Sequence, residues 1–271
     1  MNKNIKAIQL AAVNCTLLVV LLISSCGKKK EQTVVTQTGT IVFAANGEDF
    51  VRKGFVDKQG WHISFDKLFV NIVDPTAYMP SGEKYEANLA GEYWIDLAQG
   101  DENAEPITVG ALENVKAANY QSLKFSLKRR SSGEYKGYSI VMIGTAEKEG
   151  TTVPFTIQCD EEMDFNGKEG YVGDEIKGMV KPGDTASVEM TFHFDHIFGD
   201  KEAPEDDHVN TGSVGFDFFD KFRKDGKVIC SQSEMKSADG YATLVKAIWT
   251  LGHLGEGHCA VSNQSSSEEI K

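Results

Sequence analysis

Two histidines and two aspartates share a ten-residue segment, TFHFDHIFGD, at residues 191–200. Read as a β-strand, the segment places phenylalanines on one face, and His193 and Asp195 together on the other. His196 breaks this alternation, so we expect the strand to end or bulge there. Imidazole together with carboxylate suits Zn²⁺ or another first-row transition metal. The alternative is a solvent-facing strand edge, on which the histidines pair with the aspartates.

A second group of possible ligands lies near the C-terminus, in GHLGEGHC at residues 252–259. Its glycines allow the backbone to turn sharply and to approach another segment closely. A closed structural zinc site takes four ligands, so we expect the two segments to meet if the last helix folds back across the sheet. The predicted metal ligands are His193, Asp195, His196, Glu256, His258 and Cys259. The alternative is that the glycines cap a helix, Cys259 forms a disulfide and the histidines are exposed.

The N-terminal residues are typical of an export signal. Lys3 and Lys6 precede an apolar run, and the small residues of ISSCG follow it. Cys26 at the end of this run resembles the lipobox cysteine of bacterial lipoproteins, which carries acyl chains such as palmitate. We therefore expect 1–25 to be a signal peptide and 26–39 a lipidated tether. An uncleaved membrane anchor is the alternative, but a spanning helix needs about 20 apolar residues.

This interpretation places the protein in the bacterial cell envelope, attached to the membrane through its lipid. Gly27, rather than aspartate, follows the cysteine, and by analogy with enterobacterial sorting this favours the outer membrane. Removing two lysines with the signal peptide changes the net charge from −12 to −14. Nucleic acid is excluded as a partner, because its binding requires a basic surface. An acidic surface attracts cations, although it also serves simply for solubility.

Three cysteines remain after the lipidated one: Cys159, Cys230 and Cys259. Outside the cytoplasm two of them could form a disulfide, and the third would stay free, bind a metal or pair with another chain. The sequence leaves the choice among the three pairings open.

The body of the chain, at residues 40–260, is predicted to be mainly β. Short segments rich in β-branched and aromatic residues alternate with Gly, Asp, Asn and Pro clusters, and QSLKFSLK alternates between apolar and polar positions. This spacing favours an antiparallel β-sandwich. Two helices are expected near the C-terminus, in GSVGFDFFDKFRK and SADGYATLVKAIWTLG, where the apolar period becomes helical. Residues 261–271 are expected to be disordered.

Three segments, GWHISFDKLFVNI, TFHFDHIFGD and GHLGEGHC, resemble parts of uncharacterised bacterial secreted lipoproteins with a β-sandwich body. The resemblance implies export and anchoring, and it implies no reaction. Together with the histidines it favours a non-catalytic lipoprotein that binds a transition metal such as zinc. A surface adhesion or ligand-binding sandwich without metal is the rival. A metal-dependent hydrolase would need an open coordination position and a base such as Glu256.

Overall fold

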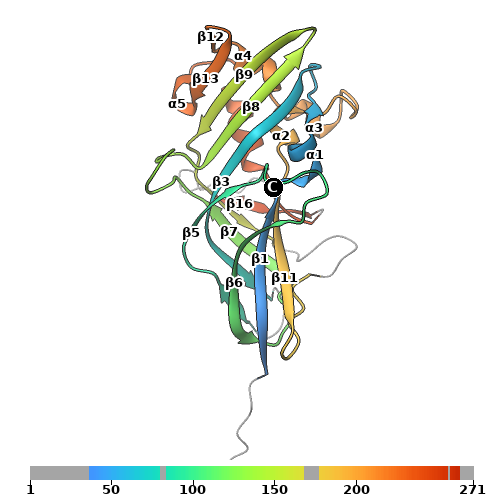
Figure 1. Ribbon diagram of the computed structural model, residues 1–271, viewed down its shortest axis with the longest axis vertical. Coiled ribbons are helices and arrows are strands. Elements are labelled where there is room, and N and C mark those ends of the chain that lie inside the picture. Colours follow the sequence, from blue (N-terminus) through green and yellow to red (C-terminus); the bar gives the residue numbers. More distant parts are fainter. Residues whose placement is uncertain (1–36, 80–83, 168–176, 256, 263–271) are drawn as a thin grey trace, which may run out of the picture. The chain divides into compact units, whose positions relative to one another are not determined.

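The computed structural model describes residues 37–79, 84–167, 177–255 and 257–262 (Figure 1). These residues belong to one compact unit that extends from Thr36 to Lys271. The predicted signal peptide, Cys26, most of the tether and most of the C-terminal tail lie outside the described residues.

The described strands form two sheets, called here sheets A and B. In spatial order, sheet A contains β15 (Gly257–His258), β14 (Gly252–Leu254), β11 (Thr185–Phe192), β1 (Thr38–Asn46) and β6 (Ile107–Lys116). The main path of sheet B contains β12 (Arg223–Lys224), β13 (Lys227–Ser231), β9 (Thr151–Cys159), β8 (Ile140–Lys148), β3 (His62–Tyr78), β7 (Ser122–Leu127), β10 (Met163–Asn166) and β16 (Ala260–Ser262). Three further strands pair with β3: β2 (Phe55–Val56), β4 (Glu86–Asn88) and β5 (Glu92–Asp96).

The described helices are short and lie between the strands. They are α1 (Glu48–Lys53), α2 (Asp195–Phe198), α3 (His208–Thr211), α4 (Phe216–Asp220), α5 (Gln232–Met235) and α6 (Tyr241–Trp249). Strand accounts for 47% and helix for 15% of the structure, so the predicted mainly β class is confirmed. The sheets are mixed rather than wholly antiparallel, because β1 runs parallel to β11 and β13 parallel to β9.

The two expected C-terminal helices correspond to α4 and α6, but both are shorter than the predicted segments. After α4 the chain turns into a hairpin, in which Arg223 and Lys224 form β12. Helix α6 ends at Trp249, and Gly252, expected to terminate it, is instead the first residue of β14. The apolar period of these segments indicated helices, but strand pairing with the sheets determined where the helices end.

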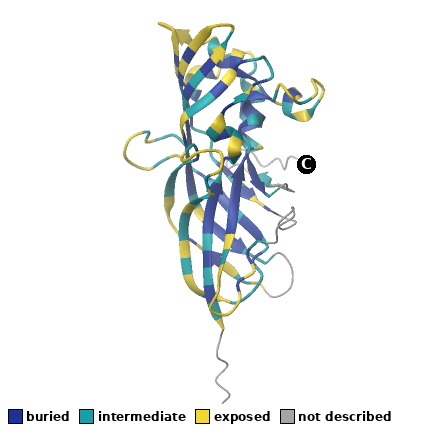
Figure 2. Cartoon of the chain, turned by 45° about the vertical axis from the view of Figure 1, so that its right-hand side comes forward, coloured by how far each residue is buried: buried dark blue, intermediate teal, exposed yellow. Residues whose placement is uncertain are grey.

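A continuous apolar core joins the two sheets. The rings of Phe192 in β11 and Phe125 in β7 lie 5.6 Å apart in an edge-to-face arrangement. In β7 the predicted apolar face of Leu123, Phe125 and Leu127 is buried, and Ser122 on the opposite face is buried as well. Figure 2 shows buried residues along the strands of both sheets and exposed residues at many of the turns. Each such buried side chain contributes about 1.5–3 kcal/mol relative to an exposed one.

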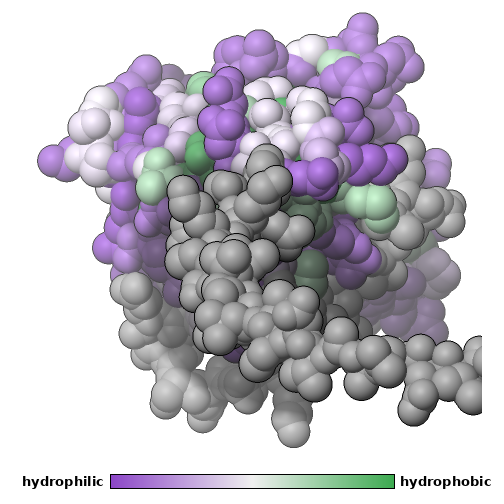
Figure 3. All heavy atoms as spheres, turned by 90° about the horizontal axis from the view of Figure 1, so that it is seen from below, coloured by the Kyte–Doolittle hydropathy of each residue, from purple (hydrophilic) through white to green (hydrophobic). Residues whose placement is uncertain are grey.

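The surface is mainly polar. On the face that Figure 3 shows, hydrophilic residues predominate among those described. Among the described residues, the large hydrophobic side chains that are exposed are Val56, Met179 and Ile229. A search of the same residues finds no helix with the length and apolar character needed to span a membrane.

Candidate metal centre

Three neighbouring strands of sheet A bring the candidate residues to one edge. In the strand register, Asn46 of β1 lies beside Thr191 of β11, and Thr191 lies beside His253 of β14. Strands β1 and β11 are parallel, so the residues that follow each strand leave the sheet at the same edge. Two residues further along are Glu48 after β1 and His193 after β11. The sheet therefore places these two side chains and His253 near one another.

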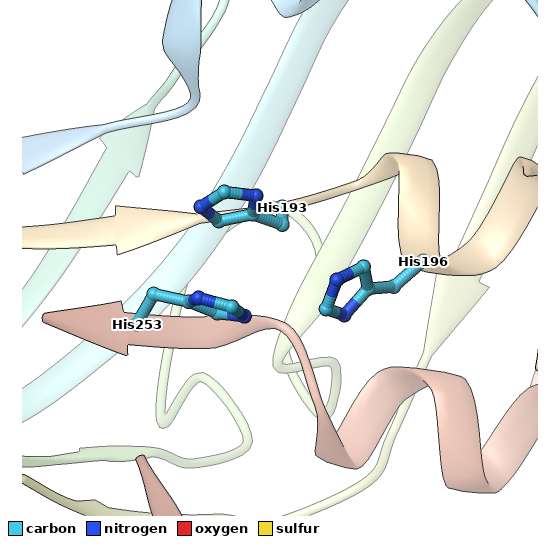
Figure 4. Close-up of side chains that lie close together, drawn as sticks. All are labelled: His193, His196 and His253. Carbon is cyan, nitrogen blue, oxygen red and sulfur yellow. The ribbon is translucent and has the colours of Figure 1, made fainter. Parts of the chain in front are cut away.

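Three histidines converge at this edge. His193 follows β11, His196 lies in the first turn of α2, and His253 belongs to β14 (Figure 4). One nitrogen from each ring lies within 4.8 Å of the other two. The rings of His193 and His253 are stacked, with centroids 4.0 Å apart, and the centroid of His196 is 5.6 Å and 5.2 Å from theirs. We call these three residues the histidine triad.

The spacing of the histidine triad is slightly wider than that of a loaded zinc site. Nitrogens bound tetrahedrally to one zinc at about 2.0–2.1 Å lie about 3.3 Å apart. Because the three nitrogens lie within 4.8 Å of one another, binding one zinc requires each pair to approach by at most about 1.5 Å. His196 and His253 are 8% and 3% exposed. Three rings packed this closely would repel one another if all were protonated, and the neutral ring is the form that binds metals.

Hydrogen bonds to Thr250 determine which nitrogen His196 presents. Its Nδ1 lies 2.9 Å from both the carbonyl oxygen and the hydroxyl oxygen of Thr250. A carbonyl oxygen only accepts, so Nδ1 carries the hydrogen and donates it. The hydroxyl of Thr250 donates to the carbonyl of Ala247 at 2.9 Å and therefore also presents a lone pair to the ring. Nε2 is thus the atom of His196 that would bind a metal, as is usual when the other ring nitrogen is held by an oxygen acceptor.

Asp195 does not lie beside His193 as the strand pattern predicted. Strand β11 ends at Phe192, and Asp195 begins α2. Successive side chains in a helical turn are rotated by about 100° rather than 180°, so the shared face is lost. Among the described residues, the metal-type group contains the histidine triad without Asp195. Its Oδ1 accepts a hydrogen bond from the backbone N–H of His196 at 3.1 Å, and burial raises the pKa of Asp195 to about 6.

The C-terminal segment contributes a different residue from those predicted. Cys259 is not part of the group, and burial raises the pKa of its thiol to about 12. Glu256 lies outside the described residues. The backbone of His258 pairs with that of His253, but its side chain lies outside the description. His253 belonged to the predicted segment and was left out of the predicted ligand set, because only the pairing of β14 with β11 selects it.

The three cysteines among the described residues are free thiols, so none of the three possible pairings is formed there. Cys159 and Cys230 are buried in the core, and Cys259 is partly buried. Burial raises the pKa of Cys230 to about 12 and that of Cys159 further.

A small cavity of about 230 Å³ adjoins His196. It is lined by His196, His208, Val209, Gly212, Lys246, Ala247 and Thr250. The ring centroid of His208 is 6.4 Å from that of His196. The side chain of His208 is 77% exposed, and its Nδ1 lies 3.0 Å from a carboxylate oxygen of Asp207. His208 therefore lies at the surface beside the histidine triad and is not part of it.

A second buried polar group, Asp57, lies in the loop between β2 and β3 and is 0% exposed. Its Oδ1 accepts the backbone N–H groups of Gln59 and Trp61 at 2.9 and 2.8 Å, and its Oδ2 accepts that of Phe216 at 2.7 Å. Burial nevertheless raises the pKa of this carboxyl. Asp57 thus ties the segment before β3 to the start of α4 and has a structural role.

Comparison with known proteins identifies no relative: no family model matches the chain, and searches of curated proteins and of solved structures give no significant match.

Proposed function

We propose that the protein binds one transition-metal ion, with zinc as the first candidate, through His193, His196 and His253. The observation that carries this proposal is the convergence of three imidazoles, from three separate segments, within 4.8 Å of one another in a largely buried position. The proposed role is non-catalytic. The protein would buffer the ion, pass it on or use it to hold its C-terminal segment against the sheet.

The ligand chemistry supports zinc or a neighbouring metal. Neutral imidazole suits Zn²⁺, Cu²⁺, Ni²⁺ and Fe²⁺, whereas Ca²⁺ and Mg²⁺ take oxygen ligands. Copper binds most nitrogen sites more tightly than zinc does, so the two ions are to be compared directly. The acidic charge of the chain favours the approach of any cation.

We further propose that the mature chain is a lipoprotein of the bacterial cell envelope, anchored at the outer membrane by a lipid on Cys26, with the two sheets packed as a sandwich. The basic start, the apolar run and the cysteine that ends it support the anchor. Palmitate labelling of the wild type and of Cys26→Ser tests this part separately. Unchanged labelling in the variant would contradict the proposed anchor.

Elemental analysis of residues 27–271, purified without a histidine tag, tests metal binding. We expect one zinc per chain after dialysis against zinc, and loss of that zinc in His193→Asn, His196→Asn and His253→Asn. His62 is an exposed histidine at the start of β3, so His62→Asn is the matched control and should keep its zinc. A wild type that binds neither zinc nor copper would sink the proposal and leave an adhesion or ligand-binding sandwich as the alternative.

A further inference from the structure

Glu48 has an acidic side chain that lies beside the histidine triad. Its Oε1 lies 3.3 Å from Nε2 of His193, and the side chains of Glu48 and His193 are 34% and 16% exposed. The parallel pairing of β1 with β11 fixes this proximity, since each residue lies two positions beyond the neighbouring pair Asn46 and Thr191.

The backbone of Glu48 is held in an unusual conformation. Its φ angle is +62°, in the left-handed region, which costs an L-residue other than glycine about 1–2 kcal/mol. The side chain of Asn46 stabilises this turn, because its Oδ1 accepts the N–H of Glu48 at 3.0 Å. The Nδ2 of Asn46 in turn donates to Glu189 at 3.0 Å. Such a conformation persists only where the surrounding structure holds it, and Asn46 does so here.

We propose that Glu48 is a positioning residue of the metal centre: its carboxylate accepts the Nε2–H of His193 and thereby directs Nδ1 of that ring to the ion. This inference rests on the proposed function. One ring nitrogen cannot donate to a carboxylate and bind a metal at the same time. In Figure 4 one nitrogen of His193 lies on the side of His196, and the other points away from it.

The two histidines are then held in opposite tautomers. Thr250 accepts from Nδ1 of His196 and leaves Nε2 for the ion, whereas Glu48, whose Oε1 lies 3.3 Å from Nε2 of His193, would accept from that nitrogen and leave Nδ1. The carboxylate also adds a negative charge that makes the His193 ring more basic and partly balances the cation. Such oxygen partners of metal-binding histidines change metal affinity by about 10–100-fold.

Zinc titration of the mature chain, against a competing chelator, tests the assignment with Glu48→Gln and a matched control. Asp49→Asn removes the same charge one residue further along α1, where Asp49 is exposed and paired with Lys53. We expect zinc affinity to fall about 10–100-fold in Glu48→Gln and to stay unchanged in Asp49→Asn. The ¹⁵N NMR signals of the zinc-loaded wild type should show a protonated Nε2 and a metal-bound Nδ1 in His193.

The outcomes separate this inference from the proposed function. If the wild type binds no metal, both fail. If His253→Asn abolishes binding but Glu48→Gln matches the wild type, the histidine triad stands and the role of Glu48 is wrong. Zinc on Nε2 of His193 would also overturn the inference. So would a change of coordination number in Co²⁺ spectra of Glu48→Gln, because Glu48 would then be a direct ligand.

Glu48→Gly keeps the test decisive if Glu48→Gln folds poorly. Glycine adopts a φ of +62° without strain, so the metal-free variant should melt at or above the temperature of the wild type. It should nevertheless bind zinc as weakly as Glu48→Gln does. A Glu48→Gly variant that folds well and retains wild-type zinc affinity would contradict the proposed role.

Discussion

Asp57 and the histidine triad are both buried polar groups, but their surroundings differ in kind. The oxygens of Asp57 accept three backbone N–H groups from two segments that are distant in sequence. The histidine triad instead gathers three side chains of one chemical type, with one nitrogen of each within 4.8 Å of the other two. A buried acceptor saturated by backbone donors holds a fold together. Converging imidazoles provide the ligand arrangement of a metal site.

The comparison predicts, first, that loss of Asp57 damages folding and not metal binding. Asp57→Ala leaves three backbone N–H groups buried without an acceptor, and each costs about 1–3 kcal/mol. We expect the free energy of unfolding in urea to fall by about 3 kcal/mol or more. The zinc content per folded chain should stay at the wild-type value. A metal-free Asp57→Ala protein of unchanged stability would remove the distinction between the two groups.

For the histidine triad we expect that a substitution abolishes zinc binding, and with it the stability that bound zinc adds. Zinc at 100 times its dissociation constant should raise the free energy of unfolding by about 2.7 kcal/mol, since the ion binds the folded state alone. Thermal melts with and without zinc, repeated after addition of a chelator, measure this gain. His253→Asn should show no zinc-dependent gain and His62→Asn the full gain. Equal gains in both variants would place the metal elsewhere in the chain.

A smaller effect is expected from Thr250→Val. The substitution removes the hydroxyl that accepts from Nδ1 of His196 and keeps the carbonyl that also accepts from it. Zinc affinity should therefore fall only a few-fold, below the about 10–100-fold produced by full loss of such a partner. Thr243→Val, inside α6, is the matched control for the helix that Thr250 follows. A large loss in both variants would point to damage to α6 and not to the orientation of His196.

The smallest effect is expected at Cys259, which the sequence had predicted as a ligand. Because burial raises its thiol pKa to about 12, the thiolate is scarce near neutral pH, and its fraction grows only as the pH approaches that value. Cys259→Ser should leave zinc affinity unchanged. Alkylation of the native protein near neutral pH, followed by mass spectrometry, should be slow at Cys259 with or without zinc. If zinc protects Cys259 from alkylation, Cys259 is a metal ligand and the prediction is wrong.

Strand β7 and the segment around His193 differ in how far the sequence pattern predicted their structure. The alternation in β7 correctly predicted that its apolar side chains are buried, since a half-buried strand has a local period of two, but Ser122 on the predicted polar face is buried as well. The segment around His193 was correctly expected to meet the C-terminal bend, but the alternation was extended too far and included Asp195. Helix α2 begins at Asp195, so the strand alternation that would place Asp195 on the same face as His193 no longer applies there.

The sequence alone established a mainly β chain and two histidine-bearing segments as candidates for a metal site, because composition and short-range periodicity are local properties. Only the tertiary structure selected His253 over Cys259 and brought Glu48 to His193. Both choices depend on pairing among β1, β11 and β14, strands far apart in the chain. Their register is set by the packing of the whole core, and no short stretch of residues encodes it.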